Sequence, residues 1–101
     1  MQFGLNENAI LAIQHVFSDH SDIQKVIIYG SRAKGNFKNG SDIDLVIIAP
    51  NLGISGLLKI ENELDDLLLP YKFDLSLYHY LDHLDLLDHI NRIGKVFYVR
   101  D

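Results

Sequence analysis

The chain has 101 residues, of which 48% are hydrophobic and 23% charged, and these proportions fit a single globular domain spanning residues 1–101. Its longest apolar runs are far shorter than the roughly 18 to 20 residues that cross a bilayer, and its first residues lack the basic and apolar regions of a signal peptide. We therefore expect no membrane segment and a cytoplasmic location. The absence of cysteine excludes disulfides, thiolate metal sites and cysteine nucleophiles.

The charge balance argues against general nucleic-acid binding. Fourteen acidic residues against nine basic ones give a formal net charge of −5, whereas a general binder needs a basic face that displaces counterions from phosphates. Positive charge is concentrated in one place. Arg32, Lys34 and Lys38 lie in a stretch with no acidic residue between Lys25 and Asp42.

Hydrophobic periodicity and turn residues predict four helices alternating with four strands. Asn6 is a good N-cap for the first helix, and Pro70 and Gly94 end the third and fourth. In chain order we expect a helix that follows Asn6 and runs to residue 17, a strand over 24–29, one or two helical turns in 30–35, a strand over 42–49, a helix over 57–68, a strand over 72–78, a helix over 81–93 and a strand over 95–99.

The lengths of the connections predict a small mixed sheet flanked by helices, an α/β (α+β) fold. The helical connection between strands 42–49 and 72–78 is long enough for a right-handed crossover, so these two strands should be parallel. The very short helix in 30–35 would let strands 24–29 and 42–49 run antiparallel. The strand over 95–99 is short and flanked by charges, which suits an edge position.

Two aspartates at the start of the second strand are candidates for metal binding. Because side chains alternate along a strand, Asp42 and Asp44 would point to one face, roughly 6.5 to 7 Å apart. Carboxylates so close repel one another, and a hard cation such as Mg²⁺ would relieve the repulsion. Asp74, near the start of the neighbouring strand, is the expected third ligand, and three such carboxylates could hold two metal ions. The alternative is that they are ordinary turn or cap carboxylates.

The segment after the first strand is suited to binding phosphate. Gly30 permits a close approach of the backbone, Ser31 adds a hydroxyl donor, and the amides that open the short helix are further donors. Arg32 and Lys34 bring positive charge, either in direct contact with a nucleotide or as solvated helix charges. A phosphate site facing a carboxylate cluster is the requirement for chemistry on a nucleoside triphosphate.

Other ligand motifs do not apply to this chain. Residues 30–35 lack the glycine spacing of a dinucleotide-binding fingerprint, and there is no Gly-Lys-Ser/Thr of a P-loop. The five histidines show no paired spacing on one face with a third ligand, which argues against zinc.

Together, these motifs resemble those of the nucleotidyltransferase superfamily that includes DNA polymerase β. The matching strings are Gly30-Ser31-Arg32-Ala33-Lys34-Gly35 and Ser41-Asp42-Ile43-Asp44-Leu45, followed by Asp74 on a later strand. They look like the minimal branch of the superfamily, small proteins that accompany HEPN-domain partners in prokaryotic toxin–antitoxin pairs. The motifs cover residues 29–48 and 72–77, and the order of elements is compatible over the whole chain.

The resemblance implies a fold similar to the polymerase β palm and a role for each matching residue. Gly30 and Ser31 would bind the β- and γ-phosphates, and Asp42 and Asp44 would hold two Mg²⁺ ions. Asp74 would bind the catalytic metal and help to deprotonate the acceptor hydroxyl. The candidate nucleotide-binding residues are Gly30, Ser31, Arg32, Lys34 and Ser41.

The function implied is transfer of a nucleotide, AMP from ATP, onto a hydroxyl of a HEPN-domain partner, which would make the chain an antitoxin. Larger relatives carry extra domains that grip the acceptor, whereas 101 residues are nearly consumed by the catalytic sheet and its helices. Two alternatives stay open. The chain could be a non-catalytic nucleotide-binding antitoxin that acts by complex formation, or it could modify a small molecule. A homo-oligomer or a hetero-oligomer is compatible with each.

Overall fold

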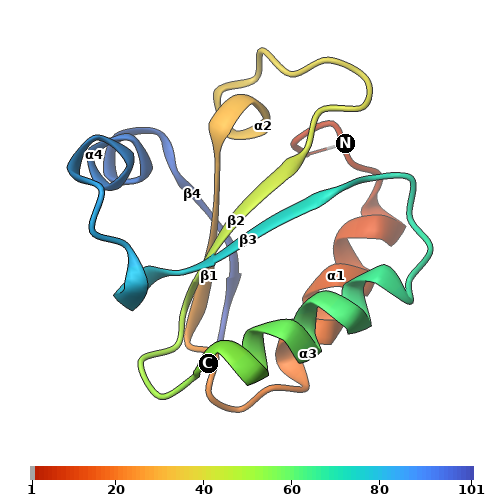
Figure 1. Ribbon diagram of the computed structural model, residues 1–101. Coiled ribbons are helices and arrows are strands. Elements are labelled where there is room, and N and C mark those ends of the chain that lie inside the picture. Colours follow the sequence, from red (N-terminus) through yellow and green to blue (C-terminus); the bar gives the residue numbers. More distant parts are fainter. Residues whose placement is uncertain (1) are drawn as a thin grey trace.

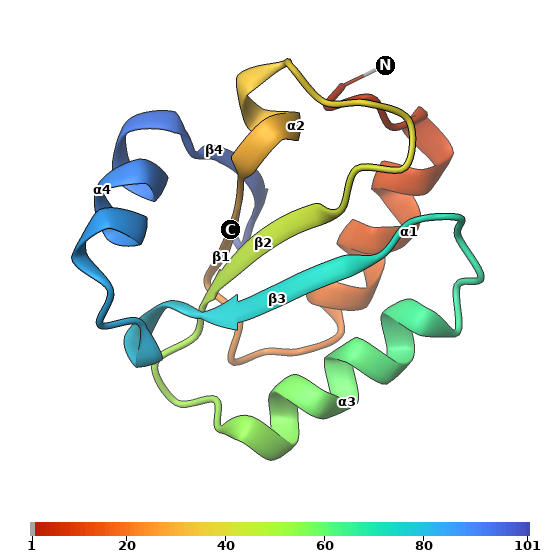
Figure 2. The same ribbon diagram turned by 45° about the horizontal axis from the view of Figure 1, so that its top comes forward.

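The computed structural model describes residues 2–101 and shows a four-stranded sheet with helices on both faces (Figures 1 and 2). The strand order is β3-β2-β1-β4; β1 is antiparallel to β2 and β4, and β2 is parallel to β3. The predicted mixed sheet, its parallel pair and its edge strand are confirmed. The elements are α1 (Glu7–Ser18), β1 (Lys25–Tyr29), α2 (Gly30–Lys34), β2 (Ile43–Ile48), α3 (Ile54–Asp65), β3 (Phe73–Leu77), the 3₁₀ helix η1 (Tyr78–Tyr80), α4 (Leu84–Ile93) and β4 (Lys95–Val99).

Helix α1 begins where the sequence predicts. The side chain of Asn6 accepts a hydrogen bond from the backbone N–H of Ala9 at 2.8 Å, which satisfies one of the free amides of the first turn. The apolar face of the helix, which includes Ile13 and Phe17, is buried against the sheet. The cap and the buried apolar face explain why this part of the sequence forms a helix.

The alternation along β2 separates two apolar cores. Ile43, Leu45 and Ile47 are fully buried in the larger core, which α1 and α3 cover on one face of the sheet. Val46 points to the opposite face and joins a smaller core with Tyr29 and α4. Figure 2 shows α4 separated from α1 and α3 by the sheet. The side chain of Asp44 lies on the α4 face, beside this smaller core.

Two helix boundaries differ from the prediction. The helix expected over 57–68 spans Ile54–Asp65, because Leu67 and Leu69 reach the core from the irregular segment that follows the helix. The helix expected over 81–93 begins at Leu84, because the imidazole of His83 caps it by accepting the N–H of Leu86 at 3.2 Å. Among residues 2–101, no helix is long and apolar enough to cross a membrane.

The N-cap of α1 yields a stability prediction. Asn6→Ala should lower the free energy of unfolding by about 1 kcal/mol, because the amide of Ala9 loses its partner. Asn8→Ala, an exposed substitution inside the same helix, should leave stability unchanged or slightly raised, since alanine is the better helix former. Urea unfolding followed by circular dichroism measures the stability of both variants. Equal losses of stability would show that Asn6 does not stabilise the helix as an N-cap.

Candidate active site

The register of the sheet brings Asp44 and Asp74 together. Asp44 is the Cα partner of Asp74 across the parallel β2 and β3, and of Tyr29 across the antiparallel β1 and β2. Directly paired residues point to the same face of a sheet, so these three side chains form one row on the α4 face. Asp42 is exposed and lies one residue before β2 begins, next to the row. The register therefore makes Asp44 and Asp74 neighbours, and the three-carboxylate metal site stays a prediction.

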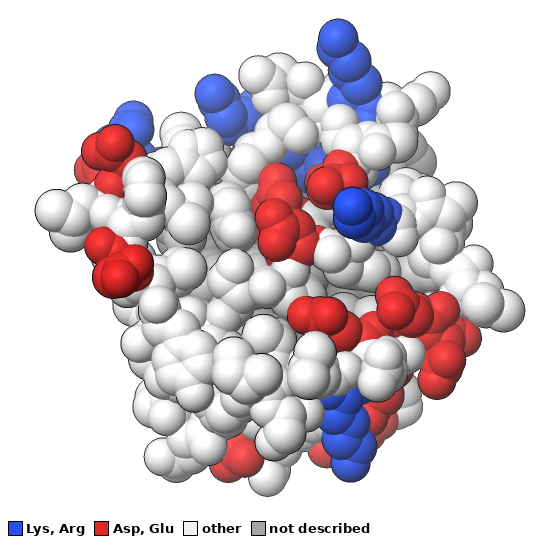
Figure 3. All heavy atoms as spheres, viewed as in Figure 1, with Lys and Arg blue, Asp and Glu red and all other residues white. Residues whose placement is uncertain are grey.

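The carboxylates make a concentrated negative site. The pKa of Asp44 is raised above the ordinary value, first by burial and then by the negative charges of Asp74 and Asp42. His89, when its ring is protonated, and Arg32 act in the opposite direction and lower this pKa, but they do not outweigh the other causes. Figure 3 shows acidic atoms gathered over the starts of β2 and β3, bordered by basic ones.

The donor set suits a hard divalent cation that is bound together with a substrate. Carboxylate oxygens are the ligands that Mg²⁺ prefers, and a cation would relieve the repulsion that raises the pKa of Asp44. Within residues 2–101, however, no three or more His, Asp or Glu side chains are arranged as a ready-made metal site. Mg²⁺ commonly takes one or two protein carboxylates and completes its shell with substrate phosphates and water. The residues fit a metal bound in that way.

The turn from β1 into α2 faces Asp44. Gly30 has φ +72°, a left-handed conformation that favours glycine, and a Cβ at this position would collide with Oδ2 of Asp44. Ser31 follows at the start of α2 and is half-buried, whereas Lys34 is exposed near the end of the helix. The glycine therefore allows the predicted phosphate-binding turn and the predicted metal-binding carboxylates to approach each other closely.

Arg32 is buried and held by several contacts. It is 3% exposed, and its guanidinium lies 5.2 Å from the ring centre of Phe37 and 5.1 Å from that of Tyr71. It donates hydrogen bonds to the carbonyl oxygen of Phe3 at 2.9 Å and to that of Ser41 at 2.9 and 3.1 Å. The interpretation as a solvated helix charge is wrong, because the aromatic rings and carbonyls enclose it. The predicted nucleotide contact of Arg32 stays a prediction.

Ser41 closes the turn that leads into β2. Its hydroxyl accepts the N–H of Lys38 at 2.9 Å, and its own N–H donates to the carbonyl of Lys38 at 3.0 Å. With its carbonyl bound to Arg32, Ser41 ties the loop 35–42 to α2 just before Asp42. These contacts give Ser41 a role in placing the carboxylates, and its predicted role in binding nucleotide stays a prediction.

His89 belongs to this region and was not predicted from the sequence. It lies on α4, and its Nε2 accepts a hydrogen bond from the backbone N–H of Gly30 at 3.1 Å. Its ring packs edge-on against Tyr29, with ring centres 6.1 Å apart. Burial and the charges of Asp74 and Asp44 raise the pKa of Tyr29, and Ser76 acts in the opposite direction without outweighing them. No local sequence pattern could identify His89 as part of this region, because its hydrogen-bond partner Gly30 lies 59 residues away in the chain.

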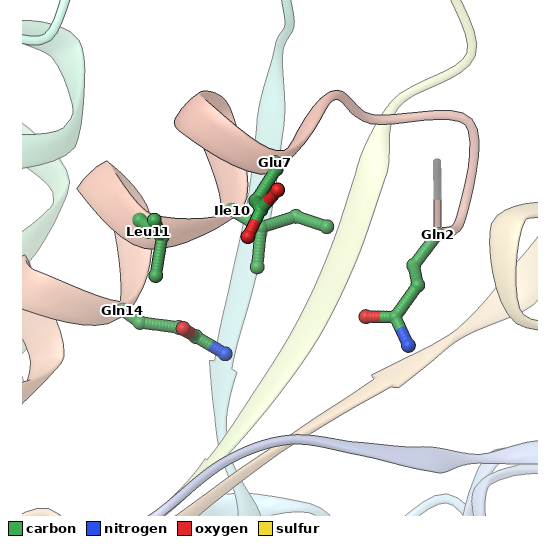
Figure 4. Close-up of a pocket in the computed structure, with 5 residues that line it drawn as sticks. All are labelled: Gln2, Glu7, Ile10, Leu11 and Gln14. Carbon is green, nitrogen blue, oxygen red and sulfur yellow. The ribbon is translucent and has the colours of Figure 1, made fainter.

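Two hollows in the surface include none of the three aspartates. The hollow in Figure 4, of about 340 Å³, lies between the N-terminal segment and α1 and is lined by Gln2, Glu7, Ile10, Leu11 and Gln14. Its one charged side chain is a carboxylate, which would repel phosphate. A hollow of about 260 Å³ beside Arg32 includes Phe37, Lys38 and Tyr71 but none of the three aspartates.

Comparison with protein families places the chain in a known family. The family described as "Polymerase beta, Nucleotidyltransferase" matches residues 12–101, which include every candidate site residue. The chain belongs to this nucleotidyltransferase family. No curated protein sequence matches the chain.

Solved structures share the fold at low sequence identity. A toxin–antitoxin structure with AMP-PNP aligns with a TM-score of 0.73 and 22% identity, over 96% of this chain and 76% of the other. A complex of a tri-AMPylated Shewanella oneidensis HEPN toxin with its MNT antitoxin has a TM-score of 0.65 and 20% identity, over 98% and 74%. A putative nucleotidyltransferase from Sulfolobus solfataricus has a TM-score of 0.53 and 16% identity, over 96% and 92%. The predicted polymerase β-like fold is confirmed.

Gly30 and Gly35 offer a matched pair for testing the close approach to Asp44. Both have positive φ, so alanine at either costs about 1 to 2 kcal/mol of backbone strain. A Cβ at Gly35 would meet nothing within 4 Å, whereas one at Gly30 would strike the carboxylate. Gly30→Ala should therefore lower the free energy of unfolding by at least about 1 kcal/mol more than Gly35→Ala. Urea unfolding measures the difference, and equal losses would refute the steric conflict.

The raised pKa of Asp44 predicts a pH-dependent stability. Between the ordinary and the raised pKa, the folded state binds more protons than the unfolded state, so this group makes stability fall as pH rises. Asp44→Asn should therefore stabilise the unliganded protein near neutral pH, and the gain should vanish at pH values below the ordinary aspartate range. Thermal unfolding over a pH series tests this, with the exposed Asp82→Asn as the control. A loss of stability in Asp44→Asn near neutral pH would be incompatible with the electrostatic argument.

Proposed function

We propose that this chain is a Mg²⁺-dependent nucleotidyltransferase that moves AMP from ATP onto a hydroxyl group of a HEPN-domain partner protein. The observation that carries the proposal is the position of Asp44, which lies between Asp74 on the neighbouring strand and Gly30 at the start of α2. Carboxylates on one side and a glycine–serine turn on the other suit a metal-bound triphosphate. The family to which the chain belongs supports this reaction.

Each site residue has a distinct task in the proposed reaction. The Gly30–Ser31 turn would bind the β- and γ-phosphates, with the backbone close to them because Gly30 has no side chain. Asp42 and Asp44 would hold two Mg²⁺ ions, with Asp74 as a further ligand. Bound there, the ions would neutralise the phosphates and lower the pKa of the acceptor hydroxyl. Asp74 is exposed on β3, where it can assist removal of the proton as the hydroxyl oxygen attacks the α-phosphorus and pyrophosphate leaves.

The proposed acceptor follows from the similar structures. One of them holds a HEPN toxin that carries three AMP groups together with its MNT antitoxin, and another toxin–antitoxin structure holds AMP-PNP. The exposure of Asp74 and Asp42 leaves this side of the proposed site open to a macromolecular acceptor. These observations favour a protein hydroxyl as the acceptor and ATP as the donor.

A transfer assay tests the proposal directly. Incubation with ATP labelled at its α-phosphate, Mg²⁺ and a HEPN-domain protein that co-purifies with the chain should label that protein. Asp44→Asn and Asp74→Asn should each reduce labelling by at least about 10²-fold, because each removes a charge that the transition state needs. Asp82→Asn and Asp85→Asn, exposed carboxylates at the start of α4, should retain labelling, and chelation of divalent ions should abolish it.

Other outcomes would support the two alternative functions. If the Asp42→Ala/Asp44→Ala double variant neutralised its toxin as well as the unaltered chain, complex formation would explain the activity and the transfer proposal would fail. If label moved to a small hydroxyl compound and not to the protein, the acceptor class would be wrong although the chemistry would stand.

A further inference from the structure

We propose that His89 is a positioning residue of the nucleotide-binding turn, which it orients by accepting the N–H of Gly30. The inference deepens the proposed function and rests on it, since it assigns to α4 a part in binding the triphosphate. The contact is direct, with 3.1 Å between Nε2 of His89 and the backbone nitrogen of Gly30. It joins α4 to the junction between β1 and α2.

Gly30 needs an external partner because its own backbone is weakly restrained. Glycine populates positive and negative φ about equally, so the observed φ of +72° is not enforced by the residue itself. The carboxylate of Asp44 occupies the space that a Cβ on Gly30 would need, and His89 accepts a hydrogen bond from the N–H of Gly30. A carboxylate and an imidazole thus constrain the Gly30 peptide, whose orientation determines where the following N–H groups point.

The imidazole is itself well placed to act as a fixed acceptor. Its ring packs edge-on against Tyr29 with an interplanar angle of 79°, and the next residue on the helix, Ile90, is 2% exposed in the smaller core. Helix packing and the aromatic contact therefore fix the ring orientation. Because Nε2 accepts a hydrogen bond, the neutral ring must carry its proton on Nδ1.

His83 shows what an ordinary structural histidine on the same helix does. Its Nδ1 accepts the N–H of Leu86 and so caps the helix to which it belongs, at an exposed position outside the proposed site. His89 instead accepts an amide from another element, one residue before the serine of the proposed phosphate-binding turn. The two histidines therefore provide a matched comparison of a helix-capping and a turn-positioning imidazole.

The test compares two substitutions at His89 that differ in hydrogen bonding. His89→Phe keeps a ring against Tyr29 but removes the acceptor, whereas His89→Gln places an amide oxygen near the position of Nε2. With Mg²⁺ and AMP-PNP as the probe in calorimetry, His89→Phe should weaken binding by about fivefold to tenfold, the loss expected for one neutral hydrogen bond. His89→Gln should restore binding to within about twofold of the unaltered chain, and His83→Phe should leave affinity unchanged.

In the transfer assay, His89→Phe should raise the KM for ATP while kcat changes little, because the turn binds the phosphates in both the ground state and the transition state. Ring-nitrogen NMR shifts should show the Nδ1–H tautomer of His89 in the unliganded chain. Unchanged affinity in His89→Phe, failure of His89→Gln to restore binding, or the Nε2–H tautomer would overturn the positioning role. If the unaltered chain binds AMP-PNP in a His89-dependent manner but transfers nothing, the positioning role stands and the proposed function fails; absence of binding would overturn both.

Discussion

The whole site depends on one combination of strand pairings around β2. The antiparallel pairing with β1 places the end of β1 and the Gly30 turn beside the start of β2, and the parallel pairing with β3 places the start of β3 there too. Asp44 and Asp74 therefore become direct neighbours although 30 positions separate them in the sequence. If β3 ran antiparallel, its first residues would lie beside the far end of β2, and Asp74 would be remote from Asp44. The short α2 and the long crossover through α3 are thus requirements of the proposed chemistry as well as of the fold.

The same pairing destabilises the unliganded protein, because it brings negatively charged carboxylates close together. Asp44 is half-buried beside two other carboxylates, and its raised pKa shows that the folded chain disfavours the charged form needed for metal binding. Arg32 lowers this pKa, but its guanidinium is already bonded to backbone carbonyls and does not offset the other causes. A divalent cation brought in with the triphosphate would remove most of the cost. In the proposed function, the substrate and its metal would therefore complete the site.

Local patterns predicted much of the fold and of the candidate site, for identifiable reasons. The alternation in Asp42-Ile43-Asp44-Leu45 indicates a strand with one buried face, and Asn6 marks a helix start, because both signals act over a few residues. The burial of Arg32 could not be predicted in this way, since it depends on Phe3, Phe37 and Tyr71 converging from three parts of the chain. The start of α4 at Leu84 was missed because Leu81 packs into the smaller core without being helical.

The carboxylate side and the turn side of the candidate site are held in place by different contacts. This difference suggests which of the two sides adjusts to a ligand. Asp44 lies on a strand hydrogen-bonded on both edges, with fully buried Ile43 and Leu45 as its neighbours. The opposite turn begins at a glycine and continues into a helix of five residues, too short to be stable alone. Two contacts tie this turn to distant segments: Arg32 of α2 donates to the carbonyl of Phe3, and His89 of α4 accepts the N–H of Gly30. We therefore expect the carboxylates to be fixed and the turn to be the side whose geometry distant residues tune.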